Sequence, residues 1–359
     1  MSVANLNTVS FAGLRRQLRA AYVTKRTVVL QGPPGGGKTE GVTSFLSEMI
    51  PATGTVWYFN GALKSPEYVG GVMFPVEGNT RCRLLIPDQW DLIKAGDCVV
   101  IDELDKVPHS NQNMWLEFAQ FGTIDGKKIG SGQVLTVICA NRSTDKSGSF
   151  GLSGLVGNRS KVLTFQGHPD EYVTHLATKG THHFVMAYIS ENRGDIMGTY
   201  NPSELRNATA RSWDNLSKEL FAFGEDISLS DLLTTAAAFL PDGIAMKMSV
   251  YHELAGKLIS VEEIIKNPEK AKLPGTASDR GLRFMQLHMV ASHVMGLPAG
   301  PDRGKAKTAL WKYAKRFPAE FRSAIMPCVT TSPVPLELVE DNEYGQWIAE
   351  RKRILETGK

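Results

Sequence analysis

The sequence is poor in cysteine, and the cysteines that it has lie far apart. Its 359 residues include Cys82, Cys98, Cys139 and Cys328, and no two of them form a CxxC pair. Isolated thiols favour neither a disulfide framework nor a zinc site, and they are typical of proteins in a reducing compartment. We therefore expect a cytoplasmic protein.

An excess of charge of one sign is also absent. The chain has 40 lysines and arginines against 37 aspartates and glutamates, which gives a formal net charge of +3. A protein that coats nucleic acid needs a much larger positive excess. The charge balance therefore argues against that class, although it allows a local basic patch.

Long apolar runs are missing as well, and about 20 apolar residues are needed to span a bilayer. The most apolar run, residues 232–246, is interrupted by Pro241 and Asp242. Near the amino terminus, apolar residues recur at helical spacing between arginines, without the apolar core of a signal peptide. A transit peptide is the alternative there, because the first acidic residue is Glu40. A structural helix fits better, since a strand follows closely, and we expect no membrane segment.

Glycine, in contrast, is abundant: the chain has 34 glycines, and they are clustered rather than scattered. Hydrophobic residues make up 42% of the chain and charged residues 21%. Both fractions are close to those of globular proteins, so neither a disordered nor a fibrous protein is expected. The length suggests two or three domains.

Alternating strand and helix patterns fill the first half of the chain. The expected strands cover residues 27–31, 54–60, 97–101, 134–140 and 162–165, and the expected helices cover residues 38–50, 90–95 and 111–121. This alternation predicts an α/β layer with a parallel sheet. Two β-hairpins are inserted, at residues 72–86 and 123–134, around the turn residues 77–79 and 125–126.

After residue 168 the strand patterns stop and helical patterns follow. They cover residues 169–178, 182–190, 210–223, 229–240, 245–258, 281–294, 304–317 and 342–355, with a loop over residues 266–279. We therefore expect three domains: an α/β domain over residues 1–168, a helical lid over 169–260 and a helical carboxyl-terminal extension over 261–359.

A glycine-rich loop follows the first predicted strand and opens the first predicted helix. Residues 32–39 read GPPGGGKT and fit the P-loop pattern GxxxxGK[ST] in its proper context. Backbone N–H groups of such a loop converge on phosphate oxygens, and the helix end adds partial positive charge. We expect Lys38 to reach the β- and γ-phosphates of ATP, and the Thr39 hydroxyl to join the shell of a Mg²⁺ ion. The predicted nucleotide-binding residues are Gly32, Pro33, Pro34, Gly35, Gly36, Gly37, Lys38, Thr39 and Glu40.

Two carboxylates end the predicted strand at residues 97–101, where residues 98–103 read CVVIDE. We expect Asp102 to organise Mg²⁺ through water, and Glu103 to accept a proton from the attacking water as the general base. Acids that are merely solvated or cap the next helix are the alternative, which the preceding P-loop disfavours. Glu103 beside Asp102 indicates hydrolysis of a nucleotide rather than binding alone.

These motifs resemble those of the AAA+ ATPases, and more narrowly those of their MoxR-type branch with its bacterial and phage relatives. The resemblance covers residues 8–260 and rests on the P-loop, on residues 102–107 (DELDKV) and on residues 140–142 (ANR). Looser similarities are residues 145–148, 157–159 (GNR) and 210–213 (ARSW). The two hairpins are similar in place to an insert in helix 2 and a hairpin before sensor 1 of MoxR-type proteins. The resemblance implies a parallel-sheet AAA+ core with an α-helical lid.

The resemblance also implies roles for three residues outside the first two motifs. Asn141 is similar to sensor 1, where its carboxamide would bond the attacking water and the γ-phosphate. Arg159 is the best candidate for an arginine finger, which stabilises the transferring phosphoryl group of a neighbouring subunit. Arg142 is the second candidate for that role. Arg211 resembles sensor 2 of the lid.

Each of these roles has a simpler structural alternative. Asn141 could be a polar strand cap, and the arginines could be solvated surface residues, with Arg206 an alternative to Arg211. Residues 143–155 are rich in glycine and serine. A flexible loop before Arg159 suggests that this arginine becomes ordered only against a neighbouring subunit.

Two further stretches allow more than one reading. Tyr68 and Phe74, near Gly70 and Gly71, could grip a polypeptide, or they could simply pack the base of a hairpin. Basic residues alternate with Trp311 and other aromatics in the last third of the chain, which favours either nucleic-acid binding or a solvated helix face with an aromatic core side. The basic residues are Lys305, Lys307, Lys312, Lys315, Arg316 and Arg322.

The expected function is that of an ATPase ring which remodels or activates a partner protein. A finger that acts in trans requires head-to-tail subunit contacts, and such contacts close into a ring, which is most often a hexamer in this family. The resemblance alone implies a partner with a von Willebrand A domain. The alternatives are a motor stimulated by nucleic acid, which the low net charge disfavours, and a nucleotide-dependent switch, which Glu103 disfavours.

Overall fold

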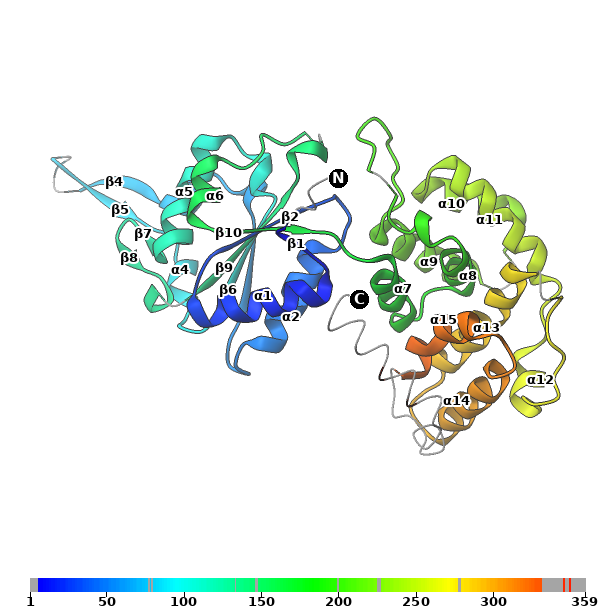
Figure 1. The fold of residues 1–359 in the computed structure, drawn as a ribbon. Helices are drawn as coiled ribbons and strands as arrows, with labels where there is room; N and C mark the ends of the chain where they lie inside the picture. The colour runs from blue at the N-terminus through cyan, green and yellow to red at the C-terminus, as the bar shows by residue number, and fades with distance from the viewer. Residues whose placement is uncertain are drawn as a thin grey trace. The chain divides into compact units, whose positions relative to one another are not determined.

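Six parallel strands form the sheet at the centre of the first unit (Figure 1). In the order in which they lie side by side, they are β1 (Thr8–Val9), β10 (Lys161–Phe165), β2 (Val28–Gly32), β9 (Leu135–Asn141), β6 (Cys98–Asp102) and β3 (Val56–Asn60). Short apolar, β-branched runs suit strands that are buried on both faces. The predicted α/β fold with a parallel sheet is confirmed. Strand β1, which was not predicted, pairs with β10 at one end of the sheet.

The computed structural model describes residues 6–330, apart from residues 77, 79, 133, 146, 147, 199, 225, 226, 277 and 278, and also residues 345 and 349. It divides into two compact units, Met1–Gly167 and His168–Lys359. Among the described residues, no helix is both long and apolar enough to cross a membrane. The predicted helix at residues 342–355 lies almost entirely outside the described residues.

Alternate side chains of the strands point to opposite faces of the sheet, and helices cover both faces (Figure 1). Leu30 belongs to a buried cluster with Leu18 of α1 (Phe11–Thr24) and Leu46 of α2 (Lys38–Met49). Val29, on the other face, belongs to a second cluster with Trp90 and Trp115. That cluster draws on α4 (Gln89–Leu92), α5 (His109–Phe121) and α6 (Gly154–Arg159). The core therefore fixes the sheet between two helical layers.

The register of the strands aligns their carboxyl ends. Gly32 at the end of β2 lies opposite Asn141 at the end of β9, and Asn60 at the end of β3 lies opposite Asp102 at the end of β6. The loops that follow these four strands therefore start from one edge of the sheet. Ligands of open α/β sheets bind at this carboxyl edge.

The first inserted hairpin has the predicted extent. It consists of β4 (Val72–Val76) and β5 (Arg81–Leu85), follows α3 (Pro66–Gly70), and projects from the rest of the first unit (Figure 1). The second hairpin is smaller than predicted, with β7 (Thr123–Ile124) and β8 (Lys127–Lys128). It ends early because Gly130, Ser131 and Gly132 have φ of 53°, 60° and 72°, which takes the chain out of the extended conformation.

The long elements in the described part of the second unit are all α-helices, joined by loops. They are α7 (Pro169–Thr178), α8 (His183–Glu191), α9 (Ala210–Phe223), α10 (Leu229–Phe239), α11 (Asp242–Ala255), α12 (Val261–Lys266), α13 (Arg280–Gly296), α14 (Pro301–Ala314) and α15 (Ala319–Thr330). Short 3₁₀ turns occur in both units, at Gly61–Leu63, Leu104–Lys106, Gly130–Gly132, Ser143–Asp145 and Arg193–Asp195. Helix α13 packs against α8 as well as α14 and α15, so helices from both sides of residue 260 share one unit. The division into three domains stays a prediction.

Candidate functional site

The glycine-rich loop connects β2 to α2 at the carboxyl edge of the sheet. Gly35 and Gly37 have φ of 67° and 78°, a left-handed region where a side chain is unfavourable. Gly32 is required for a different reason. A Cβ atom there would lie 3.0 Å from the carbonyl oxygen of Phe165 and 3.1 Å from Cδ of Lys38. The glycines therefore allow a tight loop that leads into the first turn of α2. The backbone N–H groups of such a loop and of the helix start point toward one place, and this arrangement binds phosphate.

Lys38 is almost fully buried at the first position of α2. Its ammonium donates hydrogen bonds to the carbonyl oxygens of Gly32 (2.8 Å) and Pro33 (2.9 Å), and to Oδ1 of Asn141 (3.2 Å). Burial lowers the pKa of the Lys38 ammonium, and the nearby thiol of Cys139 and carboxylate of Asp102 oppose that shift. Because an ammonium has three donors, an incoming phosphate oxygen must replace one of these partners.

Thr39 and Asp102 are joined directly across the site. Oγ1 of Thr39 donates a hydrogen bond of 2.7 Å to Oδ2 of Asp102, and the Tyr58 hydroxyl donates to the same oxygen at 3.2 Å. Partial burial, and then the Asp102 charge, raise the pKa of Tyr58 to about 12. Tyr58 therefore stays protonated near neutral pH and remains a donor to this carboxylate.

Glu103 adopts a left-handed backbone conformation, with φ 57° and ψ 28°. Such strain costs a non-glycine residue about 1–3 kcal/mol and tends to occur at functional sites. Its carboxylate accepts hydrogen bonds from Nδ2 of Asn60 (3.3 Å) and from Nζ of Lys106 (2.8 Å). The predicted general base is thus held by the neighbouring strand end on one side and by the following turn on the other.

Asn141 connects Lys38 to a buried carboxylate. Nδ2 of Asn141 donates to Oδ2 of Asp105 at 3.3 Å, and Asp105 is fully buried. Oδ1 of Asp105 has no hydrogen-bond partner in the described structure. The two ends of the Asn141 amide are therefore oriented by opposite groups, the Asp105 acceptor and the Lys38 donor. This geometry fixes the side chain beside the phosphate loop.

The two finger candidates differ in their contacts. Arg142 forms a salt bridge with the buried Asp145, with its NH2 group 2.7 Å from Oδ1, and its own backbone N–H donates to the same carboxylate. Arg159 is exposed at the end of α6, where Nε donates to Oε1 of Gln120 (2.7 Å) and NH1 donates to the Leu155 carbonyl (3.3 Å). Both arginines are bonded within their own chain, but Arg142 pairs with a buried carboxylate, whereas Arg159 is exposed and bonded to neutral groups.

The arginines predicted for the lid belong to the second unit, whereas the residues described above belong to the first. Arg211 is exposed in the first turn of α9. Arg206 forms a salt bridge of 2.9 Å with Asp242. Glu40, the last residue of the predicted nucleotide-binding set, is an exposed acid in the first turn of α2. The roles predicted for these three residues stay predictions.

The structure adds residues that the sequence patterns did not single out as site residues. They are Tyr58, Asn60, Asp105 and Lys106, all of which bond directly to a predicted site residue. Tyr58 and Asn60 come from β3, which pairs with β6 in parallel. The available signal was a polar residue at the end of a predicted strand, since parallel strands place their carboxyl ends together.

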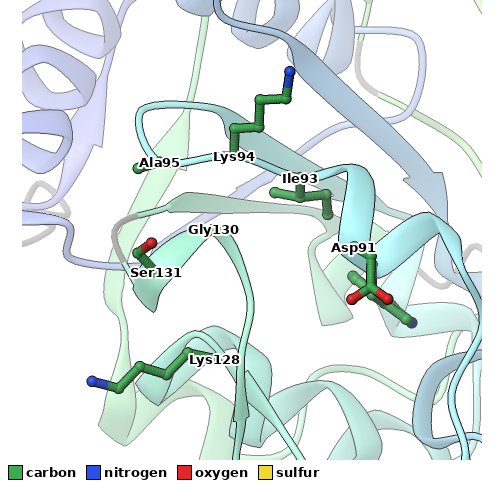
Figure 2. A pocket seen from close by; sticks show the side chains of 8 residues that line it. Asp91, Ile93, Lys94, Ala95, Lys128, Gly130 and Ser131 are labelled. Atoms are coloured by element: carbon green, nitrogen blue, oxygen red, sulfur yellow. The ribbon is translucent and has the colours of Figure 1, made fainter.

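A separate hollow of about 390 Å³ lies elsewhere in the first unit (Figure 2). Its lining includes Ile93, Lys94 and Ala95, which precede β6, and Lys128, Gly130 and Ser131, which precede β9. It therefore lies at the amino ends of these strands, away from the phosphate loop. The Lys94 and Lys128 side chains point in different directions in Figure 2, so they do not converge on one ligand.

The donor set at the carboxyl edge fits Mg²⁺. This ion prefers a few hard oxygen ligands, keeps several waters and shares phosphate oxygens with its nucleotide. The Thr39 hydroxyl and the Asp102 carboxylate provide such oxygens side by side. Among the described residues, no three His, Cys, Asp or Glu side chains form a site that could hold a metal by protein ligands alone.

Strand order and motifs together define the class of fold. Leaving β1 aside, the sheet order β10-β2-β9-β6-β3 places the P-loop strand β2 between β10 and β9. The first unit therefore has an α/β fold in which a P-loop follows strand β2, and a helical unit comes after it in the chain.

The chain is similar to several solved structures at low sequence identity. No family model matches the chain, and no curated protein matches it. Among solved structures, it is similar to the RuvB Holliday junction branch migration motor of Thermotoga maritima, with 14% identity, 72% of this chain and 75% of that chain covered, and a TM-score of 0.36. It is also similar to NtrX from Brucella abortus in complex with ADP, with 15% identity, 98% and 69% covered, and a TM-score of 0.39. The corresponding figures for NtrX in complex with ATP are 17%, 97%, 68% and 0.38.

Proposed function

We propose that this chain is an ATP-hydrolysing AAA+ ATPase of the MoxR type that remodels or activates a partner protein. The observation that supports hydrolysis is the meeting of Lys38, Thr39, Asp102, Glu103 and Asn141 at one edge of the sheet. These side chains come from three segments far apart in the sequence. Together they provide phosphate binding, oxygen ligands for a cation, and a carboxylate base.

Each residue has a distinct task in the proposed reaction. Backbone N–H groups of the loop and the Lys38 ammonium bind the phosphates of ATP. Thr39 and Asp102 would hold Mg²⁺, which neutralises charge on the phosphate oxygens when it is bound. Asn141, oriented by Asp105, donates or accepts a hydrogen bond beside the γ-phosphate. Glu103 accepts the proton of the attacking water.

The proposed assembly is a closed head-to-tail ring, with a hexamer as the expected size. Arg159 supports this proposal because it is exposed at the end of α6 and held in place by Gln120. A guanidinium presented at a surface suits a phosphate bound by the neighbouring subunit. A partner with a von Willebrand A domain is proposed from the MoxR resemblance alone.

A motor stimulated by nucleic acid was the alternative, and its supporting feature is weakened. The aromatic rings of the basic stretch, Trp311, Tyr313 and Phe317, are buried in the helical unit. Buried rings cannot stack on bases, which is how such aromatics bind single strands. Arg316 donates to the backbone carbonyls of Pro268 and Ala271 and is thereby used within the fold.

The hydrolysis proposal is tested by Glu103→Gln. Loss of a general base costs about 10²–10⁴-fold in rate, so we expect steady-state phosphate release to fall by that range. Binding of a fluorescent ATP analogue should persist, because Lys38, Thr39 and Asp102 are unchanged.

Glu48→Gln is the matched control, because Glu48 is an exposed acid on the same helix as the P-loop lysine. It should leave both binding and turnover unchanged. Full turnover by Glu103→Gln would contradict the assignment of the base. The Glu103→Gln protein, loaded with ATP, is also the variant to use for affinity capture of the partner protein.

A further inference from the structure

Apolar side chains are unusually exposed on the β4–β5 hairpin. Val72, Met73, Phe74 and Leu85 have 51%, 59%, 56% and 51% of their surface exposed. A single exposed apolar residue is ordinary, whereas a group on one projecting element marks an interaction surface. We name Val72, Phe74, Arg83 and Leu85 the hairpin face.

The pairing of the strands shows that these four residues share one side of the hairpin. Val72 lies opposite Leu85 and Phe74 lies opposite Arg83. Side chains two residues apart on a strand point to the same face, and so do directly opposite residues. The hairpin face therefore combines three apolar side chains with one guanidinium, all exposed.

The base of the hairpin is held firmly. Gly71 has φ of 86°, and a Cβ atom there would lie 2.4 Å from the carbonyl oxygen of Leu85. Only glycine fits at position 71, because a side chain there would collide with the backbone at the end of β5. Tyr68 is also occupied, because its hydroxyl donates to Oε1 of Gln89 at 2.5 Å and Lys64 lies over its ring. Of the two aromatics that could either grip a polypeptide or pack the base of the hairpin, Phe74 is thus exposed, and Tyr68 packs at the base.

The charge of the hairpin selects its ligand. Among its described residues, the charged side chains are Arg81 and Arg83, and both lie on β5 with exposed surface. The two strands form a sheet of their own, so within the described structure their outer edges pair with no other strand. Pro75 removes an N–H donor from β4. The edge of β5 is therefore the better one for a further strand.

We propose that β5 binds an extended polypeptide segment in which two acidic residues and one apolar residue occupy three successive alternate positions, so that these three side chains share one face. Added along β5, such a segment would place carboxylates beside Arg81 and Arg83 and an apolar residue beside Leu85, because both strands have a period of two. This inference rests on the proposed function, since it names the class of segment that a remodelling ATPase would engage. Aliphatic side chains dominate the face, which favours a polypeptide over the bases of a nucleic acid.

Binding is tested on the full chain with three fluorescent probes. They are an extended peptide with glutamate, glutamate and leucine at three successive alternate positions and threonine between them, the same peptide with lysine in place of glutamate, and a single-stranded oligothymidine. We expect fluorescence anisotropy to show binding of the acidic peptide, weakened by salt. Phe74→Ser should weaken this binding about tenfold, as expected when a hot-spot residue is truncated. Arg83→Glu should abolish the preference for the acidic peptide over the lysine peptide.

Met246→Ser is the matched control, since Met246 is 70% exposed on α11 of the other unit. It should bind the acidic peptide as the unchanged protein does. The inference is overturned if no peptide binds, if the lysine peptide or the oligonucleotide binds better, or if the hairpin variants change only self-association. Because binding is read without turnover, a chain that fails to hydrolyse ATP but binds the acidic peptide would contradict the ATPase proposal alone.

Discussion

The three consecutive glycines of the phosphate loop differ in conformation. Gly35 and Gly37 have positive φ, whereas Gly36 does not. We expect Gly35→Ala to weaken ATP binding about fivefold or more, because a left-handed alanine costs roughly 1–2 kcal/mol and the strain is borne by the phosphate-binding backbone. Gly36→Ala is the matched control and should bind ATP nearly as well as the unchanged protein. Titration of a fluorescent ATP analogue checks both, and equal losses would show that crowding rather than φ decides.

The sequence predicted only those site residues that belong to a recognisable motif. Lys38 and Thr39 follow directly from the loop, and Asp102 from the end of an apolar strand. Asn60 and Tyr58 could not be found in the same way, since their contacts depend on which strand pairs with β6. Asp105 lies within a quoted string of residues, but only the fold shows that it is buried against Asn141.

At the scale of elements, segments with a clear apolar or helical pattern were predicted correctly, and several short segments without one were missed. The five core strands and helices such as α7 and α9 lie within a few residues of their predicted ranges. Strand β1 and helix α12 are too short to show a period, and β1 exists only because it pairs with β10. Helix α6 lies within and after the glycine-rich stretch expected to be a loop. It begins where Oγ of Ser153 accepts a hydrogen bond from the backbone N–H of Val156.

Helix α6 is also the element on which the ring proposal depends. Arg159→Ala should abolish turnover at its neighbour's site, and Lys38→Ala should abolish turnover at its own site. In a mixed ring, an Arg159→Ala subunit whose neighbour is Lys38→Ala has an intact P-loop and an intact finger. We therefore expect phosphate release by the mixture to exceed that of either variant alone.

The control for this mixing experiment is Arg280→Ala, which removes an exposed arginine paired with Glu320 in the other unit. It should retain most of its turnover before mixing. If the mixture of Arg159→Ala and Lys38→Ala stays as inactive as its components while mixed rings form, Arg159 does not act across a subunit boundary.

At the scale of the whole molecule, the two units respond differently to acid. The second unit contains three buried histidines, His182, His183 and His288. Burial lowers the pKa of His182 and His288 to about 3 and that of His183 to about 4, and the neighbouring His183 adds to the first two shifts. In the first unit the sequence contains one histidine, His109, and it is exposed. Histidine protonation should therefore destabilise the second unit selectively.

The direction follows from proton uptake. Unfolded histidine has a pKa of about 6.5, so below that pH the unfolded second unit binds protons that the folded unit excludes. The stabilising contribution is full above about pH 6.5, and it is lost as the pH falls toward 4 and then 3. Each such histidine lowers the free energy of unfolding by up to about 1.4 kcal/mol per pH unit in this window.

Urea unfolding between about pH 7 and pH 5, followed by pulse proteolysis to separate the fragments of the two units, measures the effect. His288→Gln should reduce the pH dependence of the second unit, because it removes one titrating group while keeping a polar partner for the Ser190 hydroxyl. His293→Gln, an exposed histidine on the same helix α13, should leave the pH dependence unchanged. A second unit whose stability does not fall with pH in this window would show that these histidines are not held neutral in the folded state.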